Sequence, residues 1–180
     1  MTDKRSDKPS DRPPAATLLT PVVEFENLHE IVGKARQNLN QNHWDYIVGG
    51  TETETTLRRN RLSLDAVAFR PRVLRDVSKV DASVTEFGRK MRLPIVLAPV
   101  GNLEVFHGEG AATSGKAAGD FGIAHMVSSV CEPGLEKTAE ASPDAMRMFQ
   151  LYVRGDADWV DDHAKRAIDK GYAAFCLTVD

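Results

Sequence analysis

A run of apolar residues over 93–101 constrains the fold of this chain more than any other feature. Residues 95–98 are apolar without alternation, and Pro99, Val100 and Gly101 close the run. An apolar run of this kind is typical of a strand buried on both faces, as in a parallel sheet covered by helices. The sequence therefore predicts a buried first strand with a loop at its carboxyl end, where α/β folds keep their ligand sites.

Three further units of the same kind follow along the chain. Strands are predicted over 123–128, 147–153 and 173–179, with helices over 110–121, 133–141 and 158–170. Parallel strands need such helical crossovers, which leaves a doubly wound sheet or a (β/α)8 barrel. No G-x-G-x-x-G motif follows the first strand, which disfavours the dinucleotide-binding doubly wound fold. A barrel needs about 250 residues, so we expect about the first four strands of a TIM (β/α)8 barrel.

The chain divides into three predicted parts. Residues 1–20 are rich in Lys, Asp, Ser and Pro and are expected to form a disordered tail. Residues 21–92 are predicted to form an N-terminal lead-in, with helices over 25–39 and 55–63 and a short hairpin at its end. Residues 93–180 are predicted to form the half-barrel.

Composition and charge exclude several classes of function. The 180 residues are 42% hydrophobic and 27% charged, and the net charge of −3 gives no electrostatic basis for binding nucleic acid or an anionic membrane. No apolar run approaches the roughly 20 residues of a membrane span, and the first residues lack the apolar region of a secretory signal. Cys131 and Cys176 lie in apolar surroundings without metal-ligand spacing. We expect a reduced, cytoplasmic chain with no metal site.

Polar side chains, uncharged except for Asp180, stand where the predicted strands end. Ser128 ends the second strand, Gln150 and Tyr152 belong to the third, and Thr178 and Asp180 end the fourth. In a barrel these ends meet at one mouth. Hydroxyl and amide groups both donate and accept hydrogen bonds, which suits a flat heterocycle with alternating N–H and C=O groups. One such residue alone would be an ordinary strand-end cap, but the succession of strand ends favours a ligand site.

Six motifs carry a resemblance to a known family. They are Tyr46 with Gly49-Gly50, Phe69-Arg70-Pro71-Arg72, Leu97-Ala98-Pro99, Ser128-Ser129, Phe149-Gln150-Leu151-Tyr152-Val153 and Leu177-Thr178-Val179-Asp180. In order and spacing they resemble the FMN-dependent 2-hydroxy acid dehydrogenase/oxidase family, which includes glycolate oxidase, lactate and mandelate dehydrogenases and lactate monooxygenase. The resemblance covers about residues 25–180 and corresponds to the N-terminal half of the family.

The resemblance implies FMN as the cofactor and oxidation of a 2-hydroxy acid to a 2-oxo acid by hydride transfer to the flavin. Oxygen or an electron carrier would reoxidise the flavin. The implied cofactor-binding residues are Pro99, Val100 and Gly101 beside the reactive edge of the flavin, and Ser128, Gln150 and Thr178 along its ring. Two departures from the family pattern stand at this site. The family often has Thr-Ala-Met where this chain has Val100-Gly101-Asn102, and an aromatic residue where it has Val130.

The resemblance also implies catalytic and substrate-binding roles. Tyr46 would bind the substrate carboxylate, Tyr152 would lie near the substrate hydroxyl, and Asp180 would orient the catalytic histidine. In the family that histidine follows the fourth strand. His107 is the best placed of the histidines present, but none fits the role, so we expect the chain to be inactive alone.

Two other interpretations remain open from the sequence. The chain could be a non-catalytic half-barrel remnant or association module, because open sheet edges and an apolar face favour a homo-oligomer or a complementing half-barrel. It could also belong to another class of FMN barrel that acts on nucleotides. Tyr46 and Tyr152 in their sequence contexts argue against the nucleotide class.

Overall fold

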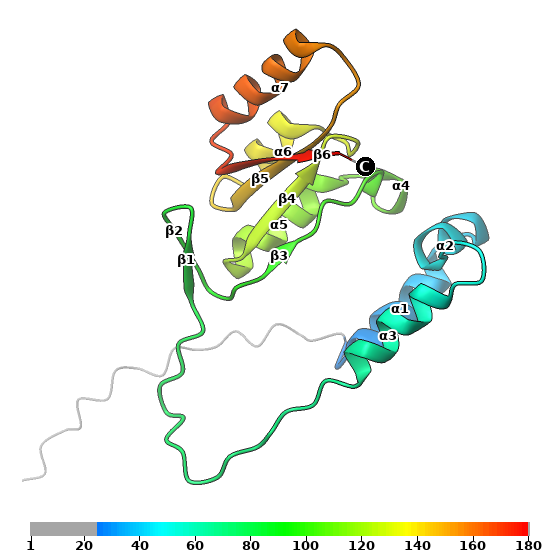
Figure 1. The fold of residues 1–180 in the computed structure, drawn as a ribbon, viewed down its shortest axis with the longest axis vertical. Helices are drawn as coiled ribbons and strands as arrows, with labels where there is room; N and C mark the ends of the chain where they lie inside the picture. Colours follow the sequence, from blue (N-terminus) through cyan, green and yellow to red (C-terminus); the bar gives the residue numbers. More distant parts are fainter. Residues whose placement is uncertain (1–24, 180) are drawn as a thin grey trace, which may run out of the picture. The chain divides into compact units, whose positions relative to one another are not determined.

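A computed structural model describes residues 25–179, which fall into two units that meet between Asn40 and Gln41. The described part of the first unit is built on helix α1 (Leu28–Asn38) (Figure 1). Asn27 caps this helix, because its side-chain oxygen accepts the backbone N–H groups of His29 and Glu30 at 3.0 and 3.2 Å. The helix predicted over 25–39 is confirmed. The tail predicted over 1–20 lies outside the described residues.

The second unit begins with two short helices and a hairpin. The helices are α2 (Gln41–Val48) and α3 (Thr55–Asp65). The hairpin pairs β1 (Val84–Glu86) with β2 (Arg89–Met91) in antiparallel register. Both residues between the strands have positive φ angles, which is the geometry of a tight two-residue turn. The predicted hairpin is confirmed.

A parallel sheet of four strands organises the rest of the second unit. Its strands are β3 (Val96–Leu97), β4 (Ala124–Ser128), β5 (Met146–Tyr152) and β6 (Ala174–Thr178), paired in the order β3-β4-β5-β6 (Figure 1). The helices are α4 (Leu103–Phe106), α5 (Ala111–Phe121), α6 (Leu135–Ala141) and α7 (Ala157–Asp169). Sequential order without reversal is that of a barrel rather than a doubly wound sheet. The predicted barrel type is confirmed, and the predicted helices over 110–170 end within two residues of the observed ones.

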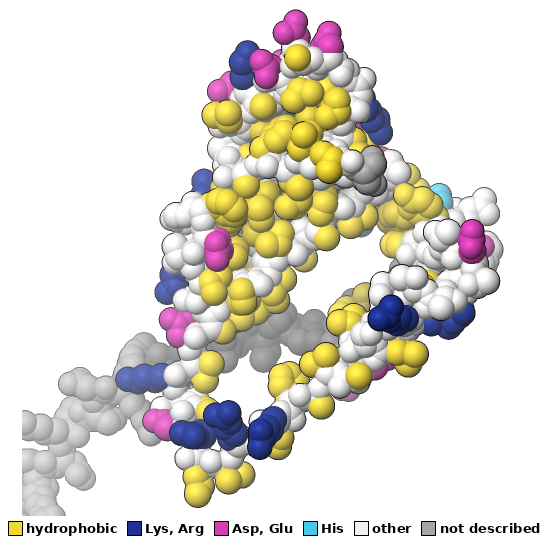
Figure 2. All heavy atoms as spheres, viewed as in Figure 1, with side chains coloured by type: hydrophobic (Ala, Val, Ile, Leu, Met, Phe, Trp, Pro, Cys, Tyr) yellow, Lys and Arg dark blue, Asp and Glu magenta, His cyan; other side chains and the backbone are white. Residues whose placement is uncertain are grey.

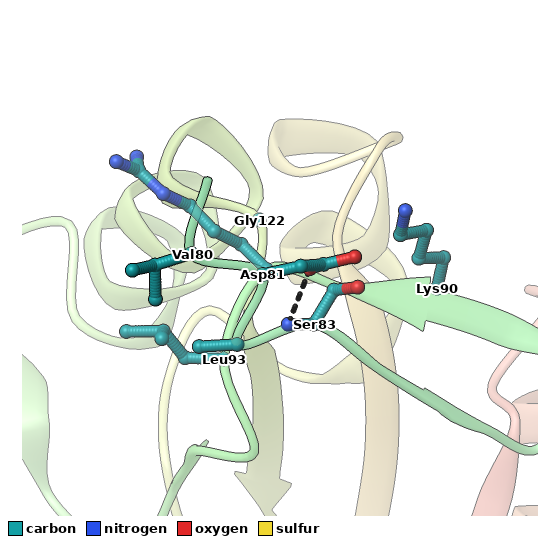
Figure 3. A pocket seen from close by; sticks show the side chains of 8 residues that line it. Val80, Asp81, Ser83, Lys90, Leu93 and Gly122 are labelled. Carbon is teal, nitrogen blue, oxygen red and sulfur yellow. Dashed lines mark hydrogen bonds between the residues drawn. The ribbon is translucent and has the colours of Figure 1, made fainter. Parts of the chain in front are cut away.

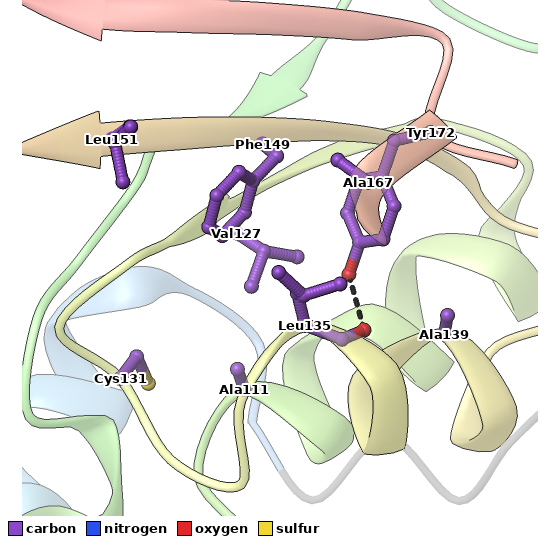
Figure 4. Packing of buried hydrophobic residues seen from close by; sticks show 9 residues of the cluster. All are labelled: Ala111, Val127, Cys131, Leu135, Ala139, Phe149, Leu151, Ala167 and Tyr172. Atoms are coloured by element: carbon purple, nitrogen blue, oxygen red, sulfur yellow. Dashed lines mark hydrogen bonds between the residues drawn. The ribbon is translucent and has the colours of Figure 1, made fainter. Parts of the chain in front are cut away.

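Helices α5, α6 and α7 pack on one face of the sheet. They contribute Ala111, Leu135, Ala139 and Ala167 to a core cluster that includes Phe149 of β5 (Figure 4). Small side chains let the helices approach closely, and the Tyr172 hydroxyl donates to the Leu135 carbonyl at 2.7 Å across this layer. The main packed core of the second unit therefore lies on the helix-facing side of the sheet. The inner face carries a smaller cluster.

The other face of the sheet changes character along the strands. At the amino ends a second cluster joins Met91 of the hairpin to Ala124, Met146 and Met148. Successive side chains of a strand alternate between faces, so Gln150 shares this inner face with Met148. The hairpin thus closes the apolar end of the inner face, and polar residues occupy its carboxyl end.

The prediction that the first strand is buried on both faces is wrong for this chain. Ile95 and Val96 are 45% and 42% exposed. β3 is an edge strand with one hydrogen-bonded neighbour, so nothing in the described residues covers its second edge. The fourth strand is also an edge, and Phe175 and Leu177 are partly exposed there; Figure 2 shows apolar side chains over this part of the surface.

Two buried polar side chains lie between the sheet and the helices. His125 of β4 and Arg147 of β5 are register partners, so their side chains share the helix-facing side. The Arg147 guanidinium donates to the carbonyls of Ser142 and Lys170, which follow α6 and α7. Its positive charge is thus placed at two helix carboxyl ends, where the helix dipole favours a cation.

His125 is 2% exposed and lies against α5. Its Nε2 atom is 3.2 Å from the Ser114 hydroxyl, while its Nδ1 atom has no hydrogen-bond partner among the described residues. A Cβ atom at Gly115 would lie 3.3 Å from Nδ1 and 2.9 Å from the Ser142 hydroxyl, so glycine allows α5 to approach the ring. Burial lowers the pKa of His125 to about 4.

The folded protein should lose stability in acid because of His125. Between the unfolded pKa of 6.5 and the folded pKa of about 4, the unfolded chain binds a proton that the folded chain excludes. The stabilisation is complete above about pH 6.5 and falls by about 3 kcal/mol as the pH drops to 4. Urea denaturation of the His125→Gln variant across this range should show a flatter pH profile than the original chain. His29→Gln on α1 is the control, and a profile that His125→Gln leaves unchanged would contradict the assignment.

Candidate functional site

A cavity of about 400 Å³ opens at the carboxyl ends of the parallel strands. It is lined by Tyr46, Pro99, Gly101, Asn102, Ser128, Val130, Gln150, Tyr152, Cys176 and Thr178. All four strands contribute to it through their last residues or the loops that follow them. None of the lining side chains carries a formal charge at neutral pH, so a ligand here is recognised by hydrogen bonds and shape.

A row of three polar side chains crosses the cavity from strand to strand. The Ser128 hydroxyl donates to Oε1 of Gln150 at 3.1 Å, and Nε2 of Gln150 donates to the Thr178 hydroxyl at 2.5 Å. Gln150 is 3% exposed and Ser128 is 4% exposed. Gln150 is thereby fixed at both ends of its amide, while one N–H, one lone pair and the Thr178 O–H stay available. This row can meet a flat ring that offers alternating donors and acceptors.

The loops after β3 and β4 form a joined wall of the cavity. A Cβ atom at Gly101 would lie 2.8 Å from Cγ2 of Val130, so only glycine fits here without a shift. The backbone N–H of Asn102 donates to the Val130 carbonyl at 3.0 Å. The Glu104 carboxylate accepts the backbone N–H of Glu132 at 3.0 Å, which ties α4 to the second loop.

Two tyrosines line the cavity, one held by ring stacking and the other by a backbone hydrogen bond. The Tyr46 ring stacks on Phe106 of α4, with centroids 6.2 Å apart and planes at 21°, and His43 meets the same Phe106 edge-on at 6.0 Å. The backbone N–H of Tyr152 donates to the Ser129 hydroxyl at 3.1 Å, which holds the end of β5 to the loop after β4. Phenol hydroxyls are neutral donors that suit a carboxylate or hydroxyl ligand.

The structure brings most of the predicted site residues together. Tyr46, Pro99, Gly101, Ser128, Gln150, Tyr152 and Thr178 all line the cavity. Val100 is 44% exposed and does not line it, and Asp180 lies outside the described residues. His107 does not line it either; its Nδ1 atom is 3.3 Å from the Thr113 hydroxyl.

Three lining residues were missing from the predicted site: Asn102, Val130 and Cys176. Asn102 and Val130 are positions where the chain departs from the family pattern, which was a usable signal. Cys176 precedes Thr178 by two residues, so the alternation of a strand places both on the inner face. That alternation could have identified Cys176.

A larger cavity of about 530 Å³ lies at the opposite ends of the strands (Figure 3). It is bounded by the hairpin region and by Leu93 and Gly122, which precede β3 and β4. Hydrogen bonds from the side chain and backbone N–H of Ser83 lower the pKa of Asp81 at its rim. Ligand sites of parallel α/β sheets lie at the carboxyl ends, so the smaller cavity is the candidate site.

Two kinds of site are missing from residues 25–179. No group of three or more His, Cys, Asp or Glu side chains is arranged to hold a metal ion. Within the same residues no helix has the length and apolar character needed to cross a membrane.

Comparison with known proteins gives a consistent set of matches. Residues 35–180 match the family model described as FMN-dependent dehydrogenase. Glycolate oxidase 1 of Oryza sativa subsp. indica is 38% identical over 157 residues, which are 87% of this chain and 42% of that protein. L-lactate oxidase of a Nostoc species is 34% identical over 90% of this chain and 45% of its own length.

A solved structure of mandelate oxidase superposes with a TM-score of 0.80 at 34% identity, over 87% of this chain and 45% of that chain. The chain therefore spans less than half the length of the relatives that it matches. Residues 35–180, which match the family model, include every residue that lines the candidate site.

The hydrogen-bonded row should be needed for stability as well as for any ligand. Gln150→Leu leaves the buried Ser128 hydroxyl and the Thr178 hydroxyl without their partner, which we expect to cost about 2 kcal/mol. Urea denaturation at pH 7 measures this loss. Gln37→Leu, at an exposed position of α1, is the matched control and should change stability by less than about 0.5 kcal/mol. An equal loss of stability in the two variants would contradict the hydrogen bonds assigned to this row.

Proposed function

Because this chain belongs to the FMN-dependent dehydrogenase family, we propose that it supplies the first half of an enzyme that oxidises a 2-hydroxy acid to a 2-oxo acid. Relatives named for glycolate, lactate and mandelate support this substrate class. The observation that carries the proposal is the row from Ser128 through Gln150 to Thr178 in the uncharged cavity. A neutral ring with alternating donors and acceptors is the ligand that such a row fits.

FMN fits the groups that line the cavity. The row offers donors and acceptors for the edge of the flavin ring, and Gly101, packed against Val130, lets the backbone after β3 approach closely. When bound, the flavin supplies the acceptor for the hydride that leaves the α-carbon of the acid. A mandelate oxidase structure described with an FMN adduct matches this chain with a TM-score of 0.77 at 33% identity, which supports the choice of cofactor.

The substrate would be held by the two tyrosines. Tyr46, braced by Phe106, is proposed to donate to the carboxylate of the acid. Tyr152, at the end of β5, is proposed to hydrogen-bond the hydroxyl that is oxidised. Asp180, which follows the last residue of β6 by two positions in the sequence, is proposed to orient the base that takes the hydroxyl proton. None of the described histidines lines the cavity, so the base is proposed to come from outside residues 25–179.

The remaining features of the proposal concern the setting of the reaction. Oxygen or an electron carrier would take electrons from the reduced flavin. A reduced, cytoplasmic location agrees with two free cysteines, Cys131 and Cys176.

A second candidate function is association through the incomplete sheet. Both edge strands carry partly exposed apolar side chains, among them Val96 at 42% and Leu177 at 47%. Unprotected parallel edges favour pairing with another chain. A complementing half-barrel or a second copy would cover them, and such a chain would be non-catalytic by itself. FMN binding by the isolated chain decides between the two functions.

The purified chain should bind FMN without supporting its reduction. We expect added FMN to show a perturbed visible spectrum, and Thr178→Val to weaken its affinity about fivefold through the loss of one hydrogen bond. Thr113→Val, at a threonine away from the cavity, is the control and should bind FMN as tightly as the original chain. Under anaerobic conditions glycolate, lactate and mandelate should not bleach the bound flavin, because no described histidine lines the cavity to act as the base.

Each possible result has a defined meaning. Bleaching by one of the acids would show that a base lies within this chain and would contradict the placement of the base outside it. Absence of FMN binding would contradict the enzyme proposal for the isolated chain and favour association. FMN binding that Thr178→Val leaves unchanged would contradict the role of the row.

A further inference from the structure

Asn102 lies in the wall of the candidate site, and its side chain makes no hydrogen bond to the described residues. It lines the cavity together with Tyr46 and Tyr152, and it is exposed. It precedes α4 at the capping position, yet its side chain makes no capping hydrogen bond. The described residues offer its carboxamide no hydrogen-bond partner, so one N–H₂ group and one carbonyl oxygen are open to a ligand.

The backbone holds this residue in one conformation. Its φ and ψ angles are 56° and 31°, in the left-handed region, where asparagine is among the few side chains commonly found. Its N–H donates to the Val130 carbonyl and its carbonyl accepts from Val105, both at 3.0 Å. The carboxamide is therefore presented from a fixed backbone.

The residues next to Asn102 on this wall have no side-chain hydrogen-bonding groups of their own. Gly101 packs against Val130, and neither offers a side-chain hydrogen bond. The other amide of the cavity, Gln150, is engaged at both ends by Ser128 and Thr178. A polar group on a ligand that faces this wall has the Asn102 carboxamide as its partner.

We propose that Asn102 is a specificity-determining residue that selects 2-hydroxy acids with a second hydrogen-bonding group, such as a hydroxyl, on the carbon next to the α-carbon. This inference rests on the proposed function, since it assigns the substrate class of the same site. An acid with a plain alkyl side chain would form no hydrogen bond with the carboxamide, so it would bind less tightly than an acid that supplies this second group.

The test compares two 2-oxo acids that differ by one hydroxyl, pyruvate and 3-hydroxypyruvate. Both bind without turnover, so dissociation constants come from the change in the visible spectrum of the FMN-loaded chain. We expect 3-hydroxypyruvate to bind about fivefold to tenfold more tightly, as one added hydrogen bond provides. The side-chain N–H₂ signal of Asn102 in an ¹⁵N spectrum should shift with 3-hydroxypyruvate and much less with pyruvate.

Asn102→Gly separates the ligand role from a backbone role. Glycine accepts the left-handed conformation without strain and removes the carboxamide, so FMN affinity and thermal stability should be kept while the preference disappears. Equal binding of the two acids by the original chain, binding of neither, or a preference that survives in Asn102→Gly would overturn the assignment and leave the proposed function standing. A chain that binds no FMN would overturn the proposed function, and the assignment with it.

Discussion

The pairing of β5 with its two neighbours is the interaction on which the other features depend. Its register sets Ser128 opposite Gln150 on one side and Tyr152 opposite Thr178 on the other. Because side chains alternate along a strand, the same register places Phe149 in the helix-facing core and Gln150 on the inner face. A slip by one residue would exchange these faces, losing the packed core and the polar row together.

Much of the fold could be predicted because it follows from local patterns. Apolar runs separated by helical segments located the strands, and the helices between them lie within two residues of their predicted ends. Strand alternation and the shared direction of parallel strands were enough to bring Ser128, Gln150 and Thr178 to one cavity. The roles of these residues toward flavin and substrate stay predictions.

The remaining features of the fold depend on contacts between residues that are distant in the chain, and a local sequence pattern does not reveal those contacts. The run over 95–98 has the composition of a doubly buried strand, yet Ile95 is 45% exposed because β3 has one neighbouring strand. The close contact of Gly101 with Val130 joins residues 29 positions apart in the chain. His125 and Arg147 had polar side chains in predicted strands, and only the packing of the helices showed how both are buried.

The ties between the loops after β3 and β4 have a dynamic consequence. Glu104 of α4 holds the backbone of Glu132, and the N–H of Ala111 donates to the carbonyl of that same residue at 2.9 Å. With the bond from Asn102 to Val130, three anchors join the two loops across the top of two strands. Neither loop can move away from the other while these three hydrogen bonds last, so a displacement of one loop carries the other with it. We therefore expect the two loops to move together rather than independently when this wall of the cavity is displaced.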